Sequence, residues 1–205
     1  MAGTTSRSLG LSGVSVEPGD HVCAFYVGQQ ERDDVLLPYV RDGLHAGDKC
    51  LGIVDSNDPA SLINDLGNGI DVHACVESHQ LELWKSTDSY LRDGKFTIDR
   101  MVEFWEETVG PAVRTDGFDF VRVFGEMTWS LRDMPGVEYL TDYESEVNRF
   151  APKYPQVIVC LYDLREFGGG LLMELLKTHP KVLLGGLVLE NPHYLSPDEY
   201  LSAKS

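Results

Sequence analysis

Several residues of this 205-residue sequence combine a reactive side chain with a position that could place it in a site. His21 and Cys23 stand two apart in the apolar stretch His21–Val27, so on a strand both side chains point to the same face. An imidazole and a thiolate could ligate zinc, but two ligands do not make a site, and Cys160 would add a third only if the strand order brings it alongside. A hydrogen-bonded histidine beside a small buried thiol is the simpler interpretation, and we expect no metal and no cofactor.

Glu126 ends a second apolar stretch, and Trp129 follows three residues later. In an ATPase a carboxylate at this position could orient water or magnesium. The same carboxylate could instead form a salt bridge or cap the following turn. Because an aromatic ring beside a buried acid suits an organic ligand, we favour a pocket-lining role for both residues over hydrolysis.

Tyr162 and Asp163 end a third apolar run, Val157–Tyr162. They could hydrogen-bond a ligand or cap the segment Leu164–Phe167, and the sequence leaves both roles open. The hydroxyl groups of Ser56, Thr128 and Ser130 are potential nucleophiles. None of them lies in a G-x-S-x-G motif or beside an evident base, so no catalytic residue is assigned.

A nucleotide-binding loop would need the pattern G-x-x-x-x-G-K-[ST] between the first strand and the first helix. That position reads Gly28-Gln29-Gln30-Glu31-Arg32-Asp33-Asp34, without a second glycine, a lysine or a Ser/Thr. Its three carboxylates would compete for the helix N-terminus and repel a triphosphate. The sequence therefore argues against tight ATP binding and against ATPase chemistry, and we expect a protein that is not an enzyme.

Short apolar runs alternate with helical patterns along the chain, and these elements must position the residues above. The expected strands are His21–Val27, Lys49–Val54, Val72–Val76, Phe118–Phe124, Val157–Tyr162 and Val182–Leu189. The expected helices are Asp33–His45, residues 59–66, Ile98–Arg114, residues 137–150 and a helix after Gly168-Gly169-Gly170, while residues 77–96 remain ambiguous.

This alternation predicts an α/β fold with a mainly parallel sheet covered by helices on both faces. In such sheets ligands bind at the carboxyl ends of the strands, which is where Glu126, Tyr162 and Asp163 are expected. We expect a flexible N-terminal tail at residues 1–13, one domain over residues 14–190 and a C-terminal tail at residues 191–205.

Composition narrows the possible partners. The sequence has 17 Lys and Arg against 33 Asp and Glu, a formal net charge of −16. Because such a chain is repelled by phosphate backbones and anionic lipid, we expect no direct nucleic-acid binding and no membrane binding. The four cysteines are widely spaced, and no signal peptide or membrane-spanning run is evident, so we expect free thiols in a reducing cytoplasm.

Four ordered stretches carry a family resemblance. They are His21–Tyr26, Arg122–Trp129, Cys160–Asp163, and Thr178-His179-Pro180 with Glu190-Asn191-Pro192-His193-Tyr194. Together they resemble the MEDS domain, the sensory domain named for methanogens, methylotrophs and the repressor of dichloromethane utilisation. The resemblance covers roughly residues 14–200.

The resemblance implies a degenerate relative of RecA- and KaiC-type ATPases, a three-layer sandwich with a P-loop fold but no working P-loop. It also implies a cytoplasmic sensor of a bacterial signalling system that binds a small organic ligand. Taken with the motifs above, the expected ligand-binding residues are His21, Cys23, Tyr26, Arg122, Glu126, Trp129, Tyr162 and Asp163.

Members of the family pass their signal to a DNA-binding, kinase or anti-sigma module. Nothing after Asn191 is long or basic enough to be a helix-turn-helix, so we expect a single-domain module acting through a regulatory protein partner, with a homo-oligomer as a further possibility. The alternatives are a residual nucleotide- or metal-dependent hydrolase and an interaction protein that binds no ligand.

Overall fold

The computed structural model describes residues 7–10, 15–55, 58–67 and 69–204. Two sheets are formed by the strands β1 (Arg7–Ser8), β2 (Ser15–Val16), β3 (His21–Tyr26), β4 (Lys49–Val54), β5 (Leu81–Lys85), β6 (Val121–Glu126), β7 (Gln156–Asp163), β8 (Lys181–Leu184) and β9 (Leu187–Glu190). The α-helices are α1 (Gly28–Ala46), α2 (Pro59–Leu66), α3 (Val72–Glu77), α4 (Ile98–Arg114), α5 (Leu140–Phe150), α6 (Gly169–Thr178) and α7 (Pro197–Lys204). Ser56 lies outside the described residues.

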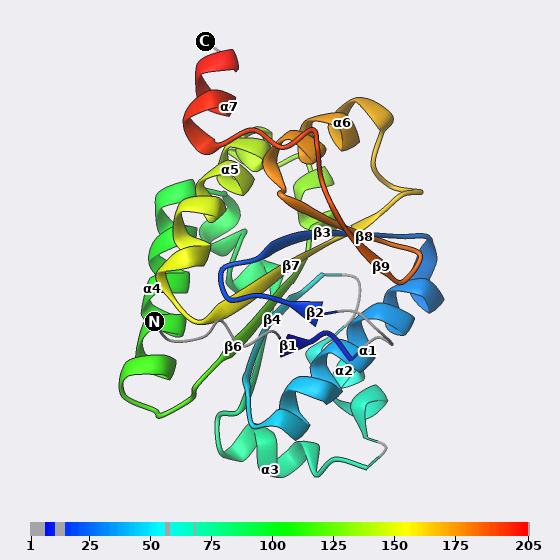
Figure 1. Ribbon diagram of the computed structural model, residues 1–205, viewed down its shortest axis with the longest axis vertical. Coiled ribbons are helices and arrows are strands. Elements are labelled where there is room, and N and C mark those ends of the chain that lie inside the picture. Colours follow the sequence, from blue (N-terminus) through cyan, green and yellow to red (C-terminus); the bar gives the residue numbers. More distant parts are fainter. Residues whose placement is uncertain (1–6, 11–14, 56–57, 68, 205) are drawn as a thin grey trace.

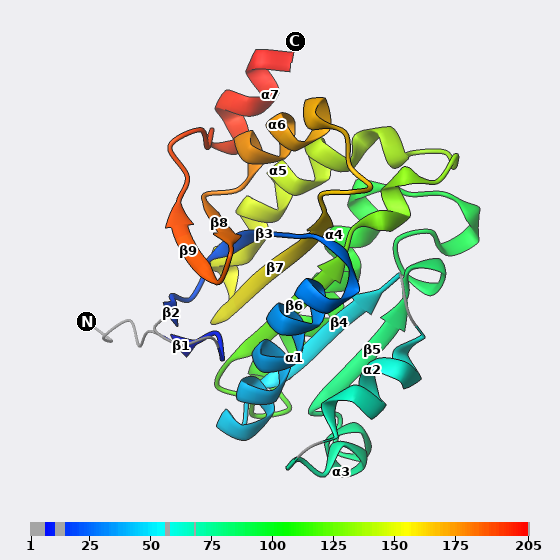
Figure 2. The ribbon, with the colours of Figure 1, turned by 90° about the vertical axis from the view of Figure 1, so that its right-hand side faces the viewer.

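The larger sheet has the strand order β5-β4-β6-β7-β3-β8-β9, and every neighbouring pair is parallel except β8 with β9 (Figure 2). Helices α4 and α5 cover one face, and α1 and α2 cover the other (Figure 1). Two separate apolar cores result, one on each face of the sheet. The expected three-layer α/β fold with a mainly parallel sheet is confirmed.

Alternation along the strands decides which side chain joins which core. In β7, Ile158, Cys160 and Tyr162 join the core beneath α4 and α5, and Val159 and Leu161 join the core beneath α1. All eight residues of β7 are buried, as expected for a central strand covered on both faces.

Two expected strands are wrong. Residues 72–76 form part of helix α3, which begins where the Asp71 carboxylate accepts a hydrogen bond from the N–H of Ala74 at 3.1 Å. The strand that pairs with β4 at this edge of the sheet is instead β5, which lies within residues 77–96, the segment that the sequence left ambiguous. The local cap therefore outweighs the β-propensity of the valines.

The expected strand Val182–Leu189 is a hairpin. Gly185 and Gly186 have φ values of 57° and 80°, the left-handed conformation that a tight type I′ turn requires at both central positions. The chain therefore reverses, and β9 becomes the antiparallel edge strand of the sheet. On this hairpin Leu184, Leu187 and Leu189 are about half exposed.

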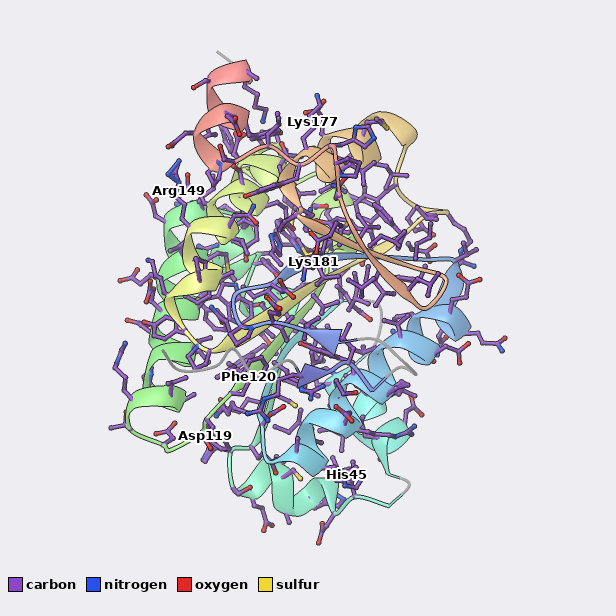
Figure 3. All side chains as sticks on the ribbon, in the orientation of Figure 1. His45, Asp119, Phe120, Arg149, Lys177 and Lys181 are labelled. Atoms are coloured by element: carbon purple, nitrogen blue, oxygen red, sulfur yellow. The ribbon has the colours of Figure 1, made fainter. Side chains whose placement is uncertain are left out.

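The last described residues form helix α7, which packs against α5. Tyr200 of α7 is buried, and Arg149 of α5 (Figure 3) donates from Nη2 to Asp198 Oδ1 at 2.6 Å. Within the described residues, no helix combines the length and the apolar character that crossing a bilayer requires.

Candidate functional site

The carboxyl edge of the sheet gathers three of the expected site residues. Tyr26, Glu126 and Asp163 end the strands β3, β6 and β7 and lie on the face that α1 covers. Glu126 is fully buried, where Arg32 Nη1 donates to its Oε1 at 2.8 Å and the N–H of Asp55 donates to its Oε2 at 2.6 Å. The salt-bridge alternative for Glu126 is the one that the structure forms.

The beginning of α1 is the position at which a phosphate loop would bind its anion. Here the chain supplies its own carboxylates: the N–H of Val27 donates to Glu31 Oε2 at 2.8 Å, and the N–H of Gly28 lies 3.3 Å from Asp163 Oδ2. Gly28 has a φ of 74°, and a Cβ on it would lie 2.7 Å from Arg165 Nη1. Two of the N–H groups at the helix N-terminus, those of Val27 and Gly28, are therefore engaged from within the molecule.

Asp163 contacts both the beginning of α1 and the side chain of Arg165. Arg165 donates to it from Nη2 at 2.7 Å and from its backbone N–H at 3.0 Å. The side-chain hydrogen bond from Arg165 lowers the pKa of the Asp163 carboxyl, against the opposing effect of burial. Burial, followed by the carboxylates of Glu126 and Asp163, raises the pKa of the Tyr26 hydroxyl, which therefore stays protonated.

A cleft of about 340 Å³ opens at this edge. It is lined by Tyr26, Gln29, Arg32, Thr128, Asp163, Arg165 and Glu166. Two positive and two negative side chains contribute to its wall, so the formal charge of the lining is balanced. The volume lies at the lower end of the range for small-molecule sites.

Asp55 connects the two segments that border this edge. Its carboxylate accepts hydrogen bonds from Ser86, from Thr128 Oγ1 at 2.7 Å and from Arg132 Nη2 at 2.5 Å. Ser86 belongs to the stretch that follows β5, and the other two donors follow β6. A single carboxylate at the end of β4 thus holds both connections together.

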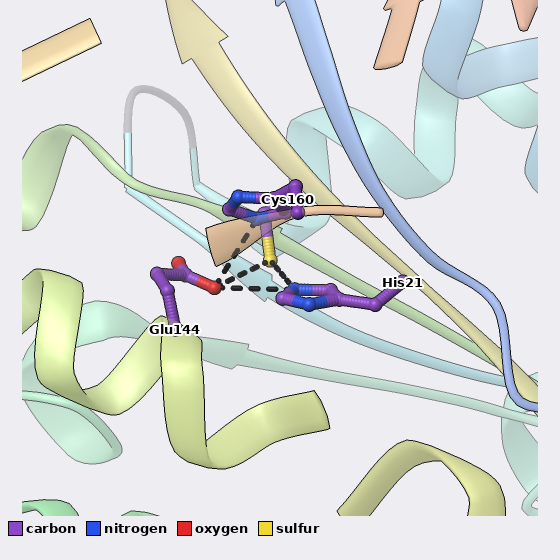
Figure 4. Close-up of side chains that lie close together, drawn as sticks. His21, Glu144 and Cys160 are labelled. Carbon is purple, nitrogen blue, oxygen red and sulfur yellow. Dashed lines mark hydrogen bonds and ion pairs between the residues drawn. The ribbon is translucent and has the colours of Figure 1, made fainter. Parts of the chain in front are cut away.

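A second polar group lies between the sheet and helix α5. His21 of β3, Glu144 of α5, Cys160 of β7 and His179, which follows α6, are all buried and present one N, O or S atom each within 4.8 Å of one another. Figure 4 shows His21, Glu144 and Cys160 converging, and we call these four residues the buried cluster. The strand order does bring Cys160 alongside His21.

Glu144 is the centre of the buried cluster. Its Oε2 lies 3.2 Å from His21 Nε2, 3.3 Å from His179 Nε2 and 3.5 Å from Cys160 Sγ, while Tyr162 donates to Oε1 at 2.5 Å. Burial alone would raise the pKa of Glu144, but the positive charge that His179 and His21 carry when they are protonated outweighs it and lowers that pKa. Burial and then the charge of His179 lower the pKa of His21.

The remaining expected residues lie elsewhere. Cys23 is fully buried and pairs in register with Cys160, but it is not one of the four members of the buried cluster. Arg122 stands near the beginning of β6, about 13 Å along the strand from Glu126, where it pairs with Asp42 and Asp48 at 2.8 Å each. It joins β6 to α1 and its following loop and does not line the cleft.

Trp129 belongs to the core. Its ring is fully buried and stacks on Tyr90 with centroids 4.5 Å apart, and Phe96 lies at 4.6 Å. The structure therefore distributes the eight expected residues over four places: the carboxyl edge of the sheet, the buried cluster and its border, the opposite end of the sheet, and the aromatic core.

The sequence did not single out Arg32, Glu144 or Arg165. Arg32 and Glu144 sit among helical surface patterns, in which a buried charge is indistinguishable from a solvated one. At the end of α6, His179 Nδ1 lies 2.8 Å from the carbonyl oxygen of Leu175. Only the fold reveals that its other nitrogen faces Glu144.

The chain has a KaiC-like α/β fold. The KaiC-like protein PH0186 from the hyperthermophilic archaeon Pyrococcus horikoshii OT3 superposes with a TM-score of 0.62, covering 87% of this chain and 79% of that one at 9% identity. Identity at this level establishes the shared fold alone.

The chain belongs to the MEDS family, described as the methanogen/methylotroph, DcmR sensory domain, which it matches over residues 20–180. It is also 26% identical over 171 residues to the transcriptional repressor DcmR of Methylorubrum extorquens. That match covers 82% of this chain and 61% of the repressor's length. The expected family is confirmed.

Proposed function

We propose that this protein is a sensory module without enzymatic activity, which binds a small, polar and uncharged organic molecule in the carboxyl-edge cleft and regulates a protein partner. The observation that carries the proposal is the internal engagement of the helix N-terminus by Glu31 and Asp163. A phosphate would have to displace both carboxylates, whereas a neutral ligand displaces neither.

The charges of the cleft support a neutral ligand. Arg32 is paired with Glu126, and Arg165 is paired with Asp163. Because each cation of the lining already has an anion, a charged ligand would break an existing pair. Polar side chains such as Gln29 and Thr128 provide hydrogen-bonding groups for an uncharged molecule.

A sensor needs two conformations that differ in affinity for the ligand. The contacts of Asp55 with Ser86, Thr128 and Arg132 tie two connections together beside the cleft, and Thr128 also lines it. We assign the conformational change to this junction. A coupling of roughly 1–3 kcal/mol between ligand and partner would suffice.

The partner surface is assigned to the β8–β9 hairpin. Leu184, Leu187 and Leu189 expose apolar side chains at the edge of the sheet, where a regulatory protein or a second copy of the chain could bury them. The sensory family and the repressor relative support a regulatory role. Residual hydrolase activity is the alternative function.

The ligand is tested by thermal unfolding against a panel of small neutral organic molecules, with ATP–Mg²⁺ in parallel. A specific ligand raises the melting temperature as its concentration increases. Adjacent exposed glutamines of α1 provide a matched pair, because Gln29 lines the cleft and Gln30 is not among its lining residues. Gln29→Ala should weaken the ligand-induced shift, and Gln30→Ala should leave it unchanged.

Micromolar ATP affinity, or ATP turnover that disappears in Glu126→Gln, would establish the hydrolase alternative. A flat response to the whole panel, with no small molecule in native mass spectra of the purified protein, would identify an interaction module without a ligand. If both glutamine variants weaken binding equally, the ligand does not bind in this cleft.

A further inference from the structure

We propose that His21, Glu144, Cys160 and His179 hold a Zn²⁺ ion in a closed tetrahedral site between the sheet and helix α5. Four potential ligand atoms from four separate parts of the chain meet at one buried point. The site is distinct from the cleft, and the argument for it does not depend on a small-molecule ligand.

Four of the six distances between the ligand atoms are close to those of a tetrahedral zinc site, and all four atoms lie within 4.8 Å of one another. Zinc bonds of about 2.0–2.1 Å to nitrogen or oxygen and about 2.3 Å to sulfur place neighbouring ligands about 3.4 Å apart, or about 3.6 Å where one is sulfur. Glu144 Oε2 lies 3.2 and 3.3 Å from the two histidine Nε2 atoms. Cys160 Sγ lies 3.5 Å from the same oxygen and 3.4 Å from His21 Nε2.

The hydrogen bonds of the histidines direct two lone pairs to this point. His179 Nδ1 lies 2.8 Å from the carbonyl oxygen of Leu175, which can only accept, so Nδ1 carries the proton. His21 Nδ1 lies 3.1 Å from Asn148 Oδ1, and the Asn148 amide nitrogen donates to the Thr178 carbonyl at 2.7 Å. When both rings are neutral, each Nε2 therefore presents a lone pair to the Glu144 carboxylate.

Two lone pairs and a carboxylate oxygen in contact repel one another unless a cation lies between them. Within the described structure, the buried His179 Nε2 makes no hydrogen bond despite lying 3.3 Å from Glu144 Oε2. A divalent metal satisfies all of these atoms at once.

Three of the four ligands are also held by a second group, as in established zinc centres. Asn148 orients His21, and the carbonyl of Leu175 orients His179. The Tyr162 hydroxyl occupies Glu144 Oε1, which leaves Oε2 for the metal. This pattern of outer hydrogen bonds fixes the rings in the tautomer that binds metal.

The ligand set selects the metal and its role. Two imidazoles, a carboxylate and a thiolate favour zinc over magnesium or calcium, which prefer oxygen ligands alone. Four protein ligands with almost no solvent exposure leave no position for water or substrate, which indicates a structural centre. The ion would join β3, β7, α5 and the segment after α6 and would enter as the chain folds.

The test measures zinc in the intact chain purified without chelator. We expect about one Zn²⁺ per chain, slow loss to EDTA under native conditions, and a lower refolding yield from denaturant when EDTA replaces zinc. Cys160→Ser and Glu144→Gln should lower zinc affinity at least about tenfold. Cys50→Ser is the matched control, since Cys50 is equally buried on the opposite face of the sheet.

Cobalt substitution identifies the ligands separately from folding. Bound Co²⁺ should give a thiolate charge-transfer band that Cys160→Ser abolishes, whereas Glu144→Gln and Cys50→Ser retain it whenever cobalt binds. A protein without zinc, whose refolding is the same in zinc and in EDTA, would overturn the proposal and leave a proton as the cation. Cobalt binding that Cys160→Ser does not alter would also overturn it.

Discussion

Arg32 and Glu126 form an ion pair buried at the carboxyl edge of the sheet, with side chains 3% and 1% exposed. An unpaired charge at such depth is strongly unfavourable, so removal of either partner should affect stability more than removal of a surface pair. This makes Arg32 a determinant of the fold as well as part of the cleft wall.

Replacing the arginine tests this role. Arg32→Met should lower the free energy of unfolding by about 3–5 kcal/mol, because the Glu126 carboxylate loses its buried counter-charge. In the double variant with Glu126→Gln the loss should be about 1–3 kcal/mol smaller than the sum of the single losses, since no uncompensated charge remains. Urea denaturation of the unchanged protein, the two single variants and the double variant measures the coupling energy between Arg32 and Glu126.

Arg165→Met is the control for this cycle. Arg165 belongs to the same cleft, but its side chain is 57% exposed, so its loss should lower stability much less than the loss of Arg32. Additive effects in the double variant would show that Arg32 and Glu126 do not stabilise each other.

At the scale of the elements, Asp163 joins the end of β7 to the beginning of α1. It accepts hydrogen bonds from the Arg165 side chain and from the N–H of Gly28. Arg165 lowers the pKa of the folded carboxyl below its ordinary value of 3.8. A lowered folded pKa means that this contribution to stability is complete above about pH 3.8 and is lost as the pH falls below it.

In Asp163→Asn we expect the free energy of unfolding to fall less steeply as the pH is lowered. Between about pH 4 and pH 2, the free energy of unfolding of the unchanged protein should fall more steeply than that of the variant, because the variant has no carboxylate to protonate here. Chemical denaturation at a series of pH values measures both slopes. Equal slopes in the two proteins would show that protonation of Asp163 does not contribute to the loss of stability in acid.

At the scale of the whole molecule, the excess of 33 acidic over 17 basic residues opposes compaction. Salt screens this repulsion within about 10 Å at 0.1 M ionic strength. The melting temperature should therefore rise by roughly 2–4 °C, about 1 kcal/mol, between low salt and 0.2 M sodium chloride. A decrease would mean that the surface ion pairs outweigh the net repulsion.

The sequence by itself determined the layers of the fold. Apolar runs as long as Val157–Tyr162 are stable only when both faces are covered, and the helical spacing of residues 98–114 matches α4 at both ends. It also determined that the first loop contains no phosphate-binding lysine. These features are local, because periodicity and motif spacing depend only on residues that are close together in the sequence.

Only the tertiary structure decided which side chains meet. His21 and Cys160 lie 139 residues apart in the chain, and parallel pairing in a defined strand order is what brings them within 3.4 Å. Arg122 and Glu126, by contrast, stand near opposite ends of one strand and are separated whatever the strand order. Proximity depends on strand order and register, which local composition does not encode, and so the buried cluster is visible only in the folded molecule.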